Sequence, residues 1–193
     1  MIIIKNLIGL GGAPGVKTVV LLFHPDMQHS LVNKRLVEAA NQKRNVTIRD
    51  MYALYSGQPI DVDAERRILM NADRVVLQFP LKWYDAPTLV QRWKEAVFDD
   101  YWLHSGKGGQ SVLASKELLL AVAYSEPSYD FTKNGKYRTT IDELLKPFQV
   151  LSIHLGMQFC QPFTIYELDD LQKSSKEYAE MIVKEDLPIQ KWF

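Results

Sequence analysis

The sequence predicts an α/β domain, in which helices cover both faces of a five-stranded parallel sheet to form a three-layer sandwich. Three observations support this prediction. Short runs rich in β-branched residues alternate with longer helical segments along the chain. No internal repeat or low-complexity linker interrupts the 193 residues, a length that favours one domain. Hydrophobic residues make up 47% of the chain, which is enough to build a core.

The first half of the chain alternates between the two kinds of segment. We expect residues 17–23 (KTVVLLF) to form a buried strand, 30–42 a helix with one apolar face, and 45–51 a second strand. Acidic residues open the helical segment 61–72, where they favour the positive end of a helix. The segment 73–79 predicts a third strand, which ends at a proline.

The second half continues the alternation. Residues 86–98 predict a helix with Pro87 in its first turn, and residues 116–124 predict a fourth strand. A fifth strand is expected over 157–168 and a final helix over 169–186. Such a sheet favours the flavodoxin-like strand order 2-1-3-4-5, in which ligands bind at the carboxyl ends of the first and third strands.

The remaining helix, residues 139–156, carries recognisable residues at both ends. Thr140 and Glu143 have the spacing of a capping box, and Gly156 is a typical helix stop. Pro147 lies inside this segment and is expected to bend or split the helix.

The charge balance and the cysteine content exclude several classes of protein. The chain has 23 basic and 23 acidic residues, and this neutrality argues against a nucleic-acid binder. Because there is one cysteine, Cys160, no internal disulfide and no Cys-rich zinc site is possible, and we expect no metal site. No apolar run reaches the length of a membrane span, and no basic leader precedes the apolar N-terminus. We therefore expect a cytoplasmic protein.

A glycine-rich stretch, GLGGAPG at residues 9–15, resembles a dinucleotide fingerprint. That motif must open a helix after a strand, whereas here a proline and another strand follow. We interpret residues 1–16 as an N-terminal extension with a flexible turn, attached to a single domain within residues 1–193.

The loop after the first strand, FHPDMQHS, contains no glycine although such loops often bind phosphate. Ser30 stands where it can cap the following helix, and the N–H groups of residues 31–33 would then point into the loop. His24 and His29 add possible donors. The residues alone leave two interpretations open: an anion site, or an ordinary helix cap beside two surface histidines.

The loop after the third strand, residues 80–86, contains two neighbouring aromatic residues, Trp83 and Tyr84. Aromatic side chains at this edge of a sheet can form a wall for a planar ring. The alternative is an aromatic plug over the end of the sheet.

Both loops carry a family resemblance. FPLKWYDAPTLVQRWKEAVF resembles the segment hPxxWyxxPaxLkxWiDkvF of the flavodoxin-like NAD(P)H:quinone oxidoreductases, and HPDMQHSLVNKRL is similar to their HPxxxxSxxNkxl. The family includes quinone reductases, reductases of the "modulator of drug activity" type and ancillary oxidoreductases of glutathione-gated potassium efflux systems. The resemblance continues through DMYAL (50–54) and covers residues 17 to about 165.

The resemblance implies an FMN-dependent enzyme, FAD being less expected, that passes two electrons by hydride transfer from NAD(P)H to a quinone or a similar flat acceptor. The residues that would hold the flavin phosphate and ribityl chain are His24, Ser30, Leu31, Val32 and Asn33. Those that would line the flavin ring are Pro80, Leu81, Lys82, Trp83 and Tyr84. Tyr129 and Tyr137 are candidates for assisting hydride transfer, although the residues by themselves favour two ordinary loop tyrosines.

One loop departs from the family pattern. Where the family usually has TTGG after the fourth strand, this chain has AYSEPSYDF at residues 123–131, which places Tyr124, Ser125 and Glu126 beside the expected flavin. This bulkier loop leaves open a degenerate, flavin-poor member of the family.

Relatives are homodimers, and aromatic residues suited to such an interface are Trp93, Phe98, Tyr101 and Trp102. A rival function remains open beside the enzyme: a flavin-binding regulatory or ancillary subunit, peripherally associated with a membrane transporter such as a potassium-efflux system.

Overall fold

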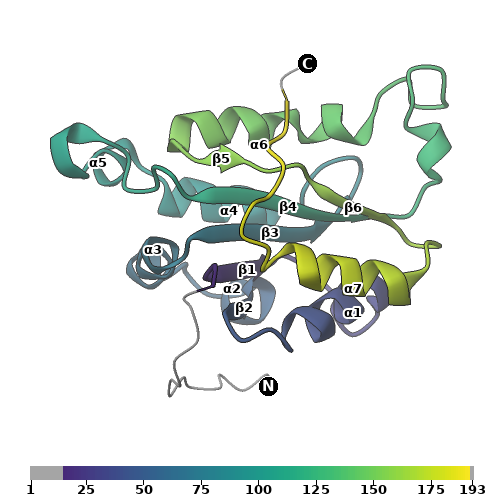
Figure 1. The fold of residues 1–193 in the computed structure, drawn as a ribbon, viewed down its shortest axis with the longest axis horizontal. Coiled ribbons are helices and arrows are strands. Elements are labelled where there is room, and N and C mark those ends of the chain that lie inside the picture. Colours follow the sequence, from purple (N-terminus) through teal and green to yellow (C-terminus); the bar gives the residue numbers. More distant parts are fainter. Residues whose placement is uncertain (1–14, 192–193) are drawn as a thin grey trace.

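The computed structural model describes residues 15–191 and shows a parallel sheet between two layers of helices (Figure 1). The strands are β1 Thr18–Leu22, β2 Val46–Asp50, β3 Arg74–Pro80, β4 Glu117–Tyr124, β5 Gln158–Phe159 and β6 Phe163–Tyr166. The helices are α1 Leu31–Ala40, α2 Met51–Tyr55, α3 Val62–Asn71, α4 Thr88–Val97, α5 Asp100–Leu103, α6 Ile141–Leu155 and α7 Leu171–Met181, with short 3₁₀ helices η1 Lys107–Gly109 and η2 Ser128–Asp130. The expected N-terminal extension and the stretch GLGGAPG lie almost entirely outside the described residues.

The sheet has the order β2-β1-β3-β4-β5, and β6 also pairs with β4, so the predicted arrangement is confirmed with its fifth position divided in two. Pro162 stands between β5 and β6, and proline has no N–H to donate to a sheet. On the outer side of β5, the N–H of Gln190 donates to the carbonyl of Phe159 at 2.9 Å. The expected single strand 157–168 is therefore two short strands, and the chain after α7 shields the outer edge of β5.

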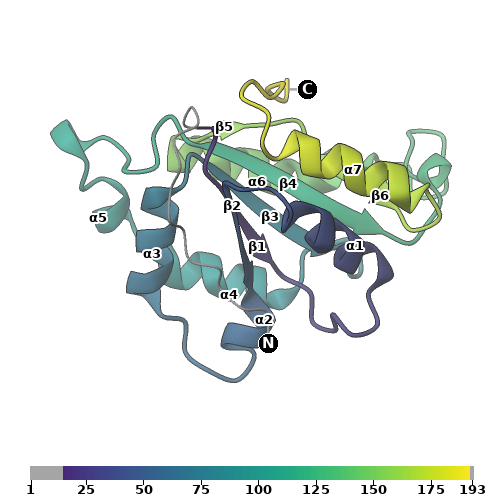
Figure 2. The same ribbon diagram turned by 60° about the horizontal axis from the view of Figure 1, so that its bottom comes forward.

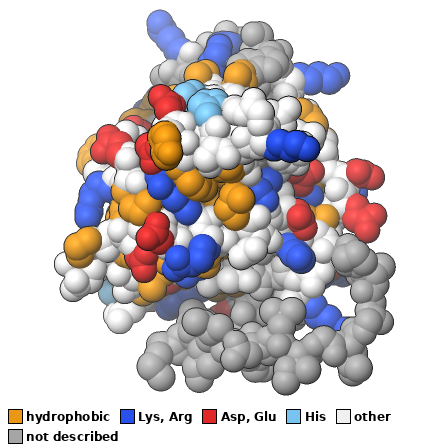
Figure 3. All heavy atoms as spheres, turned by 90° about the vertical axis from the view of Figure 1, so that its left-hand side faces the viewer, with side chains coloured by type: hydrophobic (Ala, Val, Ile, Leu, Met, Phe, Trp, Pro, Cys, Tyr) orange, Lys and Arg blue, Asp and Glu red, His pale blue; other side chains and the backbone are white. Residues whose placement is uncertain are grey.

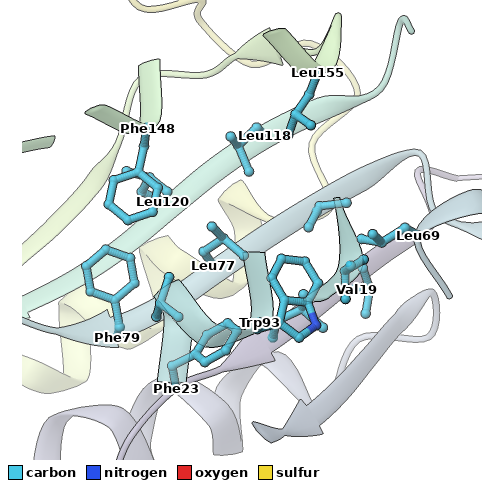
Figure 4. Packing of buried hydrophobic residues seen from close by; sticks show 14 of the residues in the cluster. Val19, Phe23, Leu69, Leu77, Phe79, Trp93, Leu118, Leu120, Phe148 and Leu155 are labelled. Carbon is cyan, nitrogen blue, oxygen red and sulfur yellow. The ribbon is translucent and has the colours of Figure 1, made fainter. Parts of the chain in front are cut away.

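β1, β3 and β4 are buried on both faces, and their alternating residues belong to two cores. Val19, Leu21 and Phe23 pack with α3, α4 and α6, as Figure 4 shows around Trp93. Val20 packs with α1 and α7, which lie side by side on the opposite face (Figure 2). This period of two is the geometry of a strand, and it explains why the strands read as continuous apolar runs.

Helix boundaries follow from local capping. Ser30 accepts a hydrogen bond from the N–H of Asn33 at 3.2 Å, which confirms the predicted cap of α1. Thr140 and Glu143 form the predicted capping box of α6, and Gly156 ends that helix with a φ of 70°. The helix continues through Pro147, so the expectation that this proline splits it is wrong.

Other boundaries differ from the expected ones. The first turn of α4 does not contain Pro87, which is the residue just before the helix. Two short helices, α2 and α5, were not predicted. Asp50 sets the start of α2, because its carboxylate accepts a hydrogen bond from the N–H of Ala53 at 3.0 Å. Asp99 caps α5 in the same way through the N–H of Trp102 at 2.8 Å.

Among residues 15–191, no helix is long and apolar enough to cross a membrane. Burial raises the pKa of the Cys160 thiol to about 12, so this thiol stays protonated at neutral pH. The cytoplasmic location inferred from the single cysteine stays a prediction.

One buried carboxylate joins four elements on the α3–α4 side of the sheet. Glu65 of α3 is fully buried and accepts hydrogen bonds from Arg49 of β2, from the hydroxyl of Tyr55 at 2.7 Å and from Nε1 of Trp93 at 3.1 Å. A buried charge is tolerated only when it is paired and hydrogen-bonded in this way. The pKa of Tyr55 rises to about 12, first through burial and then through its hydrogen bond to Glu65.

We expect Glu65→Gln to lower the free energy of unfolding by about 3 kcal/mol, because Arg49 keeps its charge and loses its buried partner. The matched control is Glu38→Gln, which removes the same charge from the exposed pair of Glu38 with Arg35 and should cost less than about 1 kcal/mol. Urea unfolding of the two variants measures both values, and equal losses would contradict a structural role for the buried pair.

Candidate functional site

A cleft of about 490 Å³ opens at the carboxyl edge of the sheet, where β1, β3, β4 and β6 end. The residues that line it are His24, Asp26, His29, Ser30, Leu31, Val32, Asn33, Pro80, Leu81, Lys82, Ala123, Tyr124, Ser125, Glu167 and Leu168. Its size falls within the range of about 300–1,000 Å³ that is usual for ligand sites. Sequence segments far apart in the chain therefore meet at the edge of the sheet that the strand order predicted.

One end of the cleft is the N-terminus of α1, a helix of ten residues. Ser30 caps it, and within the described part of the chain the N–H groups of Leu31 and Val32 have no acceptor. These N–H groups carry the positive end of the helix dipole. The cleft therefore ends in a site suited to an anion.

His24 stands beside this helix end, at the exit of β1. Its pKa is lowered, first by burial and then by the positive charge of Lys82, so the imidazole is neutral at pH 7. Its Nδ1 accepts the backbone N–H of Asp26 at 3.1 Å. A neutral imidazole that accepts at Nδ1 carries its proton on Nε2, which makes His24 a neutral donor.

The charges along the cleft are mixed. Lys82 is the only lysine or arginine among the described lining residues, and Asp26 and Glu167 are the two carboxylates. Asp26 pairs with His29 at 2.7 Å, and this hydrogen bond lowers the pKa of the carboxyl. The cleft therefore offers hydrogen-bond donors without a strong excess of positive charge.

The chain leaves β3 through a tight two-residue hairpin. Lys82 and Asp85 exchange two backbone hydrogen bonds, of 2.9 and 3.2 Å, across Trp83 and Tyr84. Both central residues have positive φ, 52° at Trp83 and 65° at Tyr84, values that are uncommon for bulky side chains. The side chain of Trp83 is left 93% exposed at the tip of this hairpin.

A cluster of aromatic rings joins the hairpin to the loop after β4. The ring of Tyr84 lies 5.0 Å from that of Tyr137, which lies 4.9 Å from Phe131. Phe131 in turn lies 5.6 Å from Tyr124, which lines the cleft. These centroid distances are typical of stabilising aromatic pairs. The aromatic cluster therefore ties the side wall of the cleft to the hairpin.

The loop after β4 is compact, although it lacks the expected glycine pair. The N–H of Tyr137 donates to the carbonyl of Asp130 at 3.1 Å, which folds the loop back on itself. A Cβ on Gly135 would lie 2.5 Å from that carbonyl oxygen, so the turn at Asn134-Gly135 requires its glycine.

The structure brings most of the predicted site residues to the cleft. Ten of them line it: His24, Ser30, Leu31, Val32, Asn33, Pro80, Leu81, Lys82, Tyr124 and Ser125. Five others lie outside its lining: Trp83, Tyr84, Glu126, Tyr129 and Tyr137. Tyr137 is linked to it through the aromatic cluster, whereas Tyr129 is 72% exposed. The roles of all these residues stay predictions.

Four lining residues were not predicted: Asp26, Ala123, Glu167 and Leu168. His29, expected as a possible donor beside Ser30, also lines the cleft. The expected fifth strand, residues 157–168, includes Glu167 and Leu168, but β6 ends at Tyr166, and the N–H of Glu167 donates to the carbonyl of Tyr124 at 3.0 Å. Because all parallel strands end at this edge, the exit of the fifth strand was a position from which these two residues could have been inferred.

Residues 16–185 match the model of a family described by its flavodoxin-like fold. The uncharacterised NAD(P)H oxidoreductase YrkL of Bacillus subtilis is 38% identical over 169 residues, which are 87% of this chain and 96% of the relative. The glutathione-regulated potassium-efflux system ancillary protein KefF of Salmonella newport is 32% identical over 170 residues, 86% of this chain and 94% of the relative.

Three solved structures share the fold. General stress protein 14 of Treponema denticola, in complex with FMN, is 28% identical with a TM-score of 0.78 and covers 84% of this chain and 95% of its own. An NADPH-quinone reductase from P. pentosaceus is 25% identical with a TM-score of 0.75, over 86% and 97%. A chain described as a thermophilic tryptophan halogenase from Streptomycin violaceusniger is 31% identical with a TM-score of 0.81, over 87% and 99%.

The family model and both curated relatives match most of the chain, including the part that forms the fold and motifs described above. The chain therefore belongs to the flavodoxin-like NAD(P)H oxidoreductase family.

Proposed function

We propose that the protein is an FMN-dependent NAD(P)H dehydrogenase that passes two electrons, by hydride transfer, to a quinone or a similar flat acceptor. The relative YrkL is named an NAD(P)H oxidoreductase, the general stress protein 14 structure holds FMN, and the neighbour from P. pentosaceus is named a quinone reductase. Tryptophan halogenation is the description of one neighbour alone and is not part of the proposal.

The proposal rests on one observation: the same cleft contains an anion site at one end and an accessible wall for a planar ring. FMN presents a phosphate at one end and a planar ring at the other. Ser30, Leu31 and Val32 offer donors at the end of α1, and His24 adds a neutral one. Pro80 and the residues next to it form the wall at the exit of β3. The lining therefore fits the group that the family resemblance implies.

The altered loop after β4 does not close this cleft. Tyr124 and Ser125 line it, and Phe131 and Tyr137 further along belong to the aromatic cluster beside the hairpin. The loop therefore leaves a cleft of about 490 Å³ at this edge of the sheet. This favours a flavin-binding member of the family over a degenerate one.

Bound FMN would supply the two-electron chemistry, by accepting a hydride from NAD(P)H and passing it on. The protein's own residues hold and orient it. Lys82 favours negative charge in the cleft, and the lowered pKa of His24 shows that its field reaches the exit of β1. Asp26 and Glu167 act against that charge.

We expect Ser30→Ala to weaken FMN binding about tenfold, because the phosphate loses a hydroxyl donor and α1 loses its cap. Trp83→Ala should weaken it about threefold to tenfold, because an exposed indole beside the cleft can stack on a planar ring. Fluorescence titration with FMN measures both dissociation constants.

The controls for this titration remove a helix cap and an exposed aromatic ring away from the cleft. Asp61→Ala removes the cap of α3, and Tyr101→Ala removes an aromatic ring that is 92% exposed at α5. Neither residue lines the cleft, so both variants should bind FMN as the wild type does. Unchanged affinity in Ser30→Ala and Trp83→Ala would count against the site.

The relative KefF supports a second candidate function, a flavin-binding ancillary subunit of a membrane transporter such as a potassium-efflux system. Such a protein would keep the same fold and motifs, so reactivity of the bound flavin has to separate the two candidates.

The enzyme hypothesis predicts a yellow protein whose flavin absorbance is bleached by NAD(P)H and restored by adding a quinone. Stopped-flow absorbance under nitrogen measures both steps. Slow bleaching without acceleration by any quinone would favour the ancillary subunit. A colourless protein that ignores added FMN would contradict both candidates.

We also propose that two copies of this chain associate through α5 and α6. Val150 and Ile153 on the outer face of α6 are 56% and 60% exposed, and Tyr101 on α5 is 92% exposed. Nε2 of His154 in α6 lies 3.2 Å from Oδ1 of Asp100 in α5, so the two helices are neighbours. Hydrophobic side chains also gather among charged ones on the face that carries α5 and α3 (Figure 3). Of the expected interface aromatics, Trp93 is instead core.

If this surface forms a dimer, Ile153→Asp should convert the dimer to a monomer, because the charge would be buried without a partner. Light scattering after size exclusion measures the mass. Leu54→Asp, at another exposed apolar residue on α2, is the control and should leave the dimer intact. A wild-type protein that is monomeric at micromolar concentration would overturn the proposal.

A further inference from the structure

A chain of buried hydrogen bonds runs from the last helix to the anion end of the cleft. Tyr178 of α7 is fully buried, and its hydroxyl donates to Oε1 of Gln78 in β3 at 2.9 Å. Nε2 of Gln78 donates to Oδ1 of Asn33 in α1 at 3.0 Å. Nδ2 of Asn33 donates to Oγ of Ser30 at 3.3 Å. The four residues come from α7, β3, α1 and the cap of α1, and only the last two line the cleft.

The donor-to-acceptor direction of these hydrogen bonds is determined by groups that can act in one way only. Nε2 of Gln78 also lies 3.4 Å from the backbone carbonyl of Asn33, which can only accept. The amide nitrogen of Gln78 must therefore face α1, and its oxygen must face Tyr178. Burial raises the pKa of Tyr178, so its hydroxyl remains a donor over the physiological pH range.

This direction determines whether the hydroxyl of Ser30 can donate its proton. Its Oγ accepts two hydrogen bonds, from the backbone N–H of Asn33 at 3.2 Å and from the side-chain amide at 3.3 Å. Both lone pairs of the hydroxyl are then used, and its own proton is left to be donated. Ser30 lines the cleft, so this proton is available to an acceptor bound there.

We propose that Tyr178 and Gln78 are positioning residues that set the hydrogen-bond polarity at the N-terminus of α1, so that Ser30 presents a donor to the phosphate of the bound flavin. The inference rests on the proposed function, because it takes that phosphate as the acceptor. Neither residue touches the cleft, and Tyr178 is separated from Ser30 by 148 positions in the sequence.

The test compares FMN with riboflavin, which has the same ring and ribityl chain but no phosphate. In Tyr178→Phe, Oε1 of Gln78 loses its buried donor, so one of the two contacts that orient the amide is gone, and FMN affinity should fall about tenfold. Riboflavin affinity should stay within about twofold of the wild type, because the phosphate site does not contribute to it. A general loss of structure would lower both affinities, so the ratio of the two dissociation constants reports positioning.

Tyr55→Phe is the matched control. Tyr55 is a buried tyrosine whose hydroxyl also donates to a buried oxygen, that of Glu65 at 2.7 Å, in the network on the opposite face of the sheet. This variant loses that hydrogen bond and the longer one that Arg49 donates to the Tyr55 hydroxyl at 3.3 Å, and it should bind both flavins as the wild type does. Gln78→Met breaks the chain at the next link and should reproduce the selective loss of FMN affinity, which keeps the test open if Tyr178→Phe does not fold.

The outcomes separate this inference from the proposed function. Equal losses for FMN and riboflavin in Tyr178→Phe and Gln78→Met, or no loss for FMN, would overturn the positioning role. A wild-type protein that binds FMN and riboflavin equally would leave the flavin enzyme standing and overturn the inference. A wild-type protein that binds neither would overturn both.

Discussion

Two buried polar side chains of the central strand β3 determine where the last helix lies. Arg74 is fully buried and donates to the carbonyls of Ile182 at 2.9 Å and Lys184 at 2.7 Å, which follow α7. Gln78, four residues along the same strand, binds Tyr178 within α7. An unpaired amide or guanidinium in this core would cost several kcal/mol, so α7 is held at both points. Because α7 packs against α1, the position of the anion end of the cleft depends on these two residues (Figure 2).

The parts of the fold that could be predicted are those with a pattern along the sequence. The strand order follows from the alternation of strands and helices along the chain, and the cap at Ser30 and the capping box of α6 follow from patterns a few residues long. Pro162 divides the expected fifth strand, because proline has no N–H to donate to the sheet. The hydrogen bond from Tyr178 to Gln78 joins chain segments that meet only after folding, and no local pattern reports it.

The hairpin after β3, at the edge of the site, departs from the usual residue preference of its turn type. A turn with positive φ at both central residues is normally built from asparagine and glycine, whereas here it holds Trp83 and Tyr84. Residues held in this region cost about 1–3 kcal/mol each. Tyr84 recovers part of that energy by packing on Tyr137, but Trp83 is exposed and recovers none from the fold. Backbone strain that the fold does not offset is expected at a place where a bound ligand offsets it. This favours a planar ring beside Trp83.

In the proposed flavin site, the direction of the donors selects the anion more than charge does. His24 is neutral, Lys82 is opposed by Asp26 and Glu167, and the whole chain has a net charge of zero. The donors that remain are the N–H groups at the start of α1, the hydroxyl of Ser30 and Nε2 of the neutral His24. Such donors bind well only when their orientation is fixed before the ligand arrives, and salt screens them less than it screens exposed charges. A site built in this way depends on the buried bonds behind it, and here these bonds run through Asn33 and β3 to the far helix.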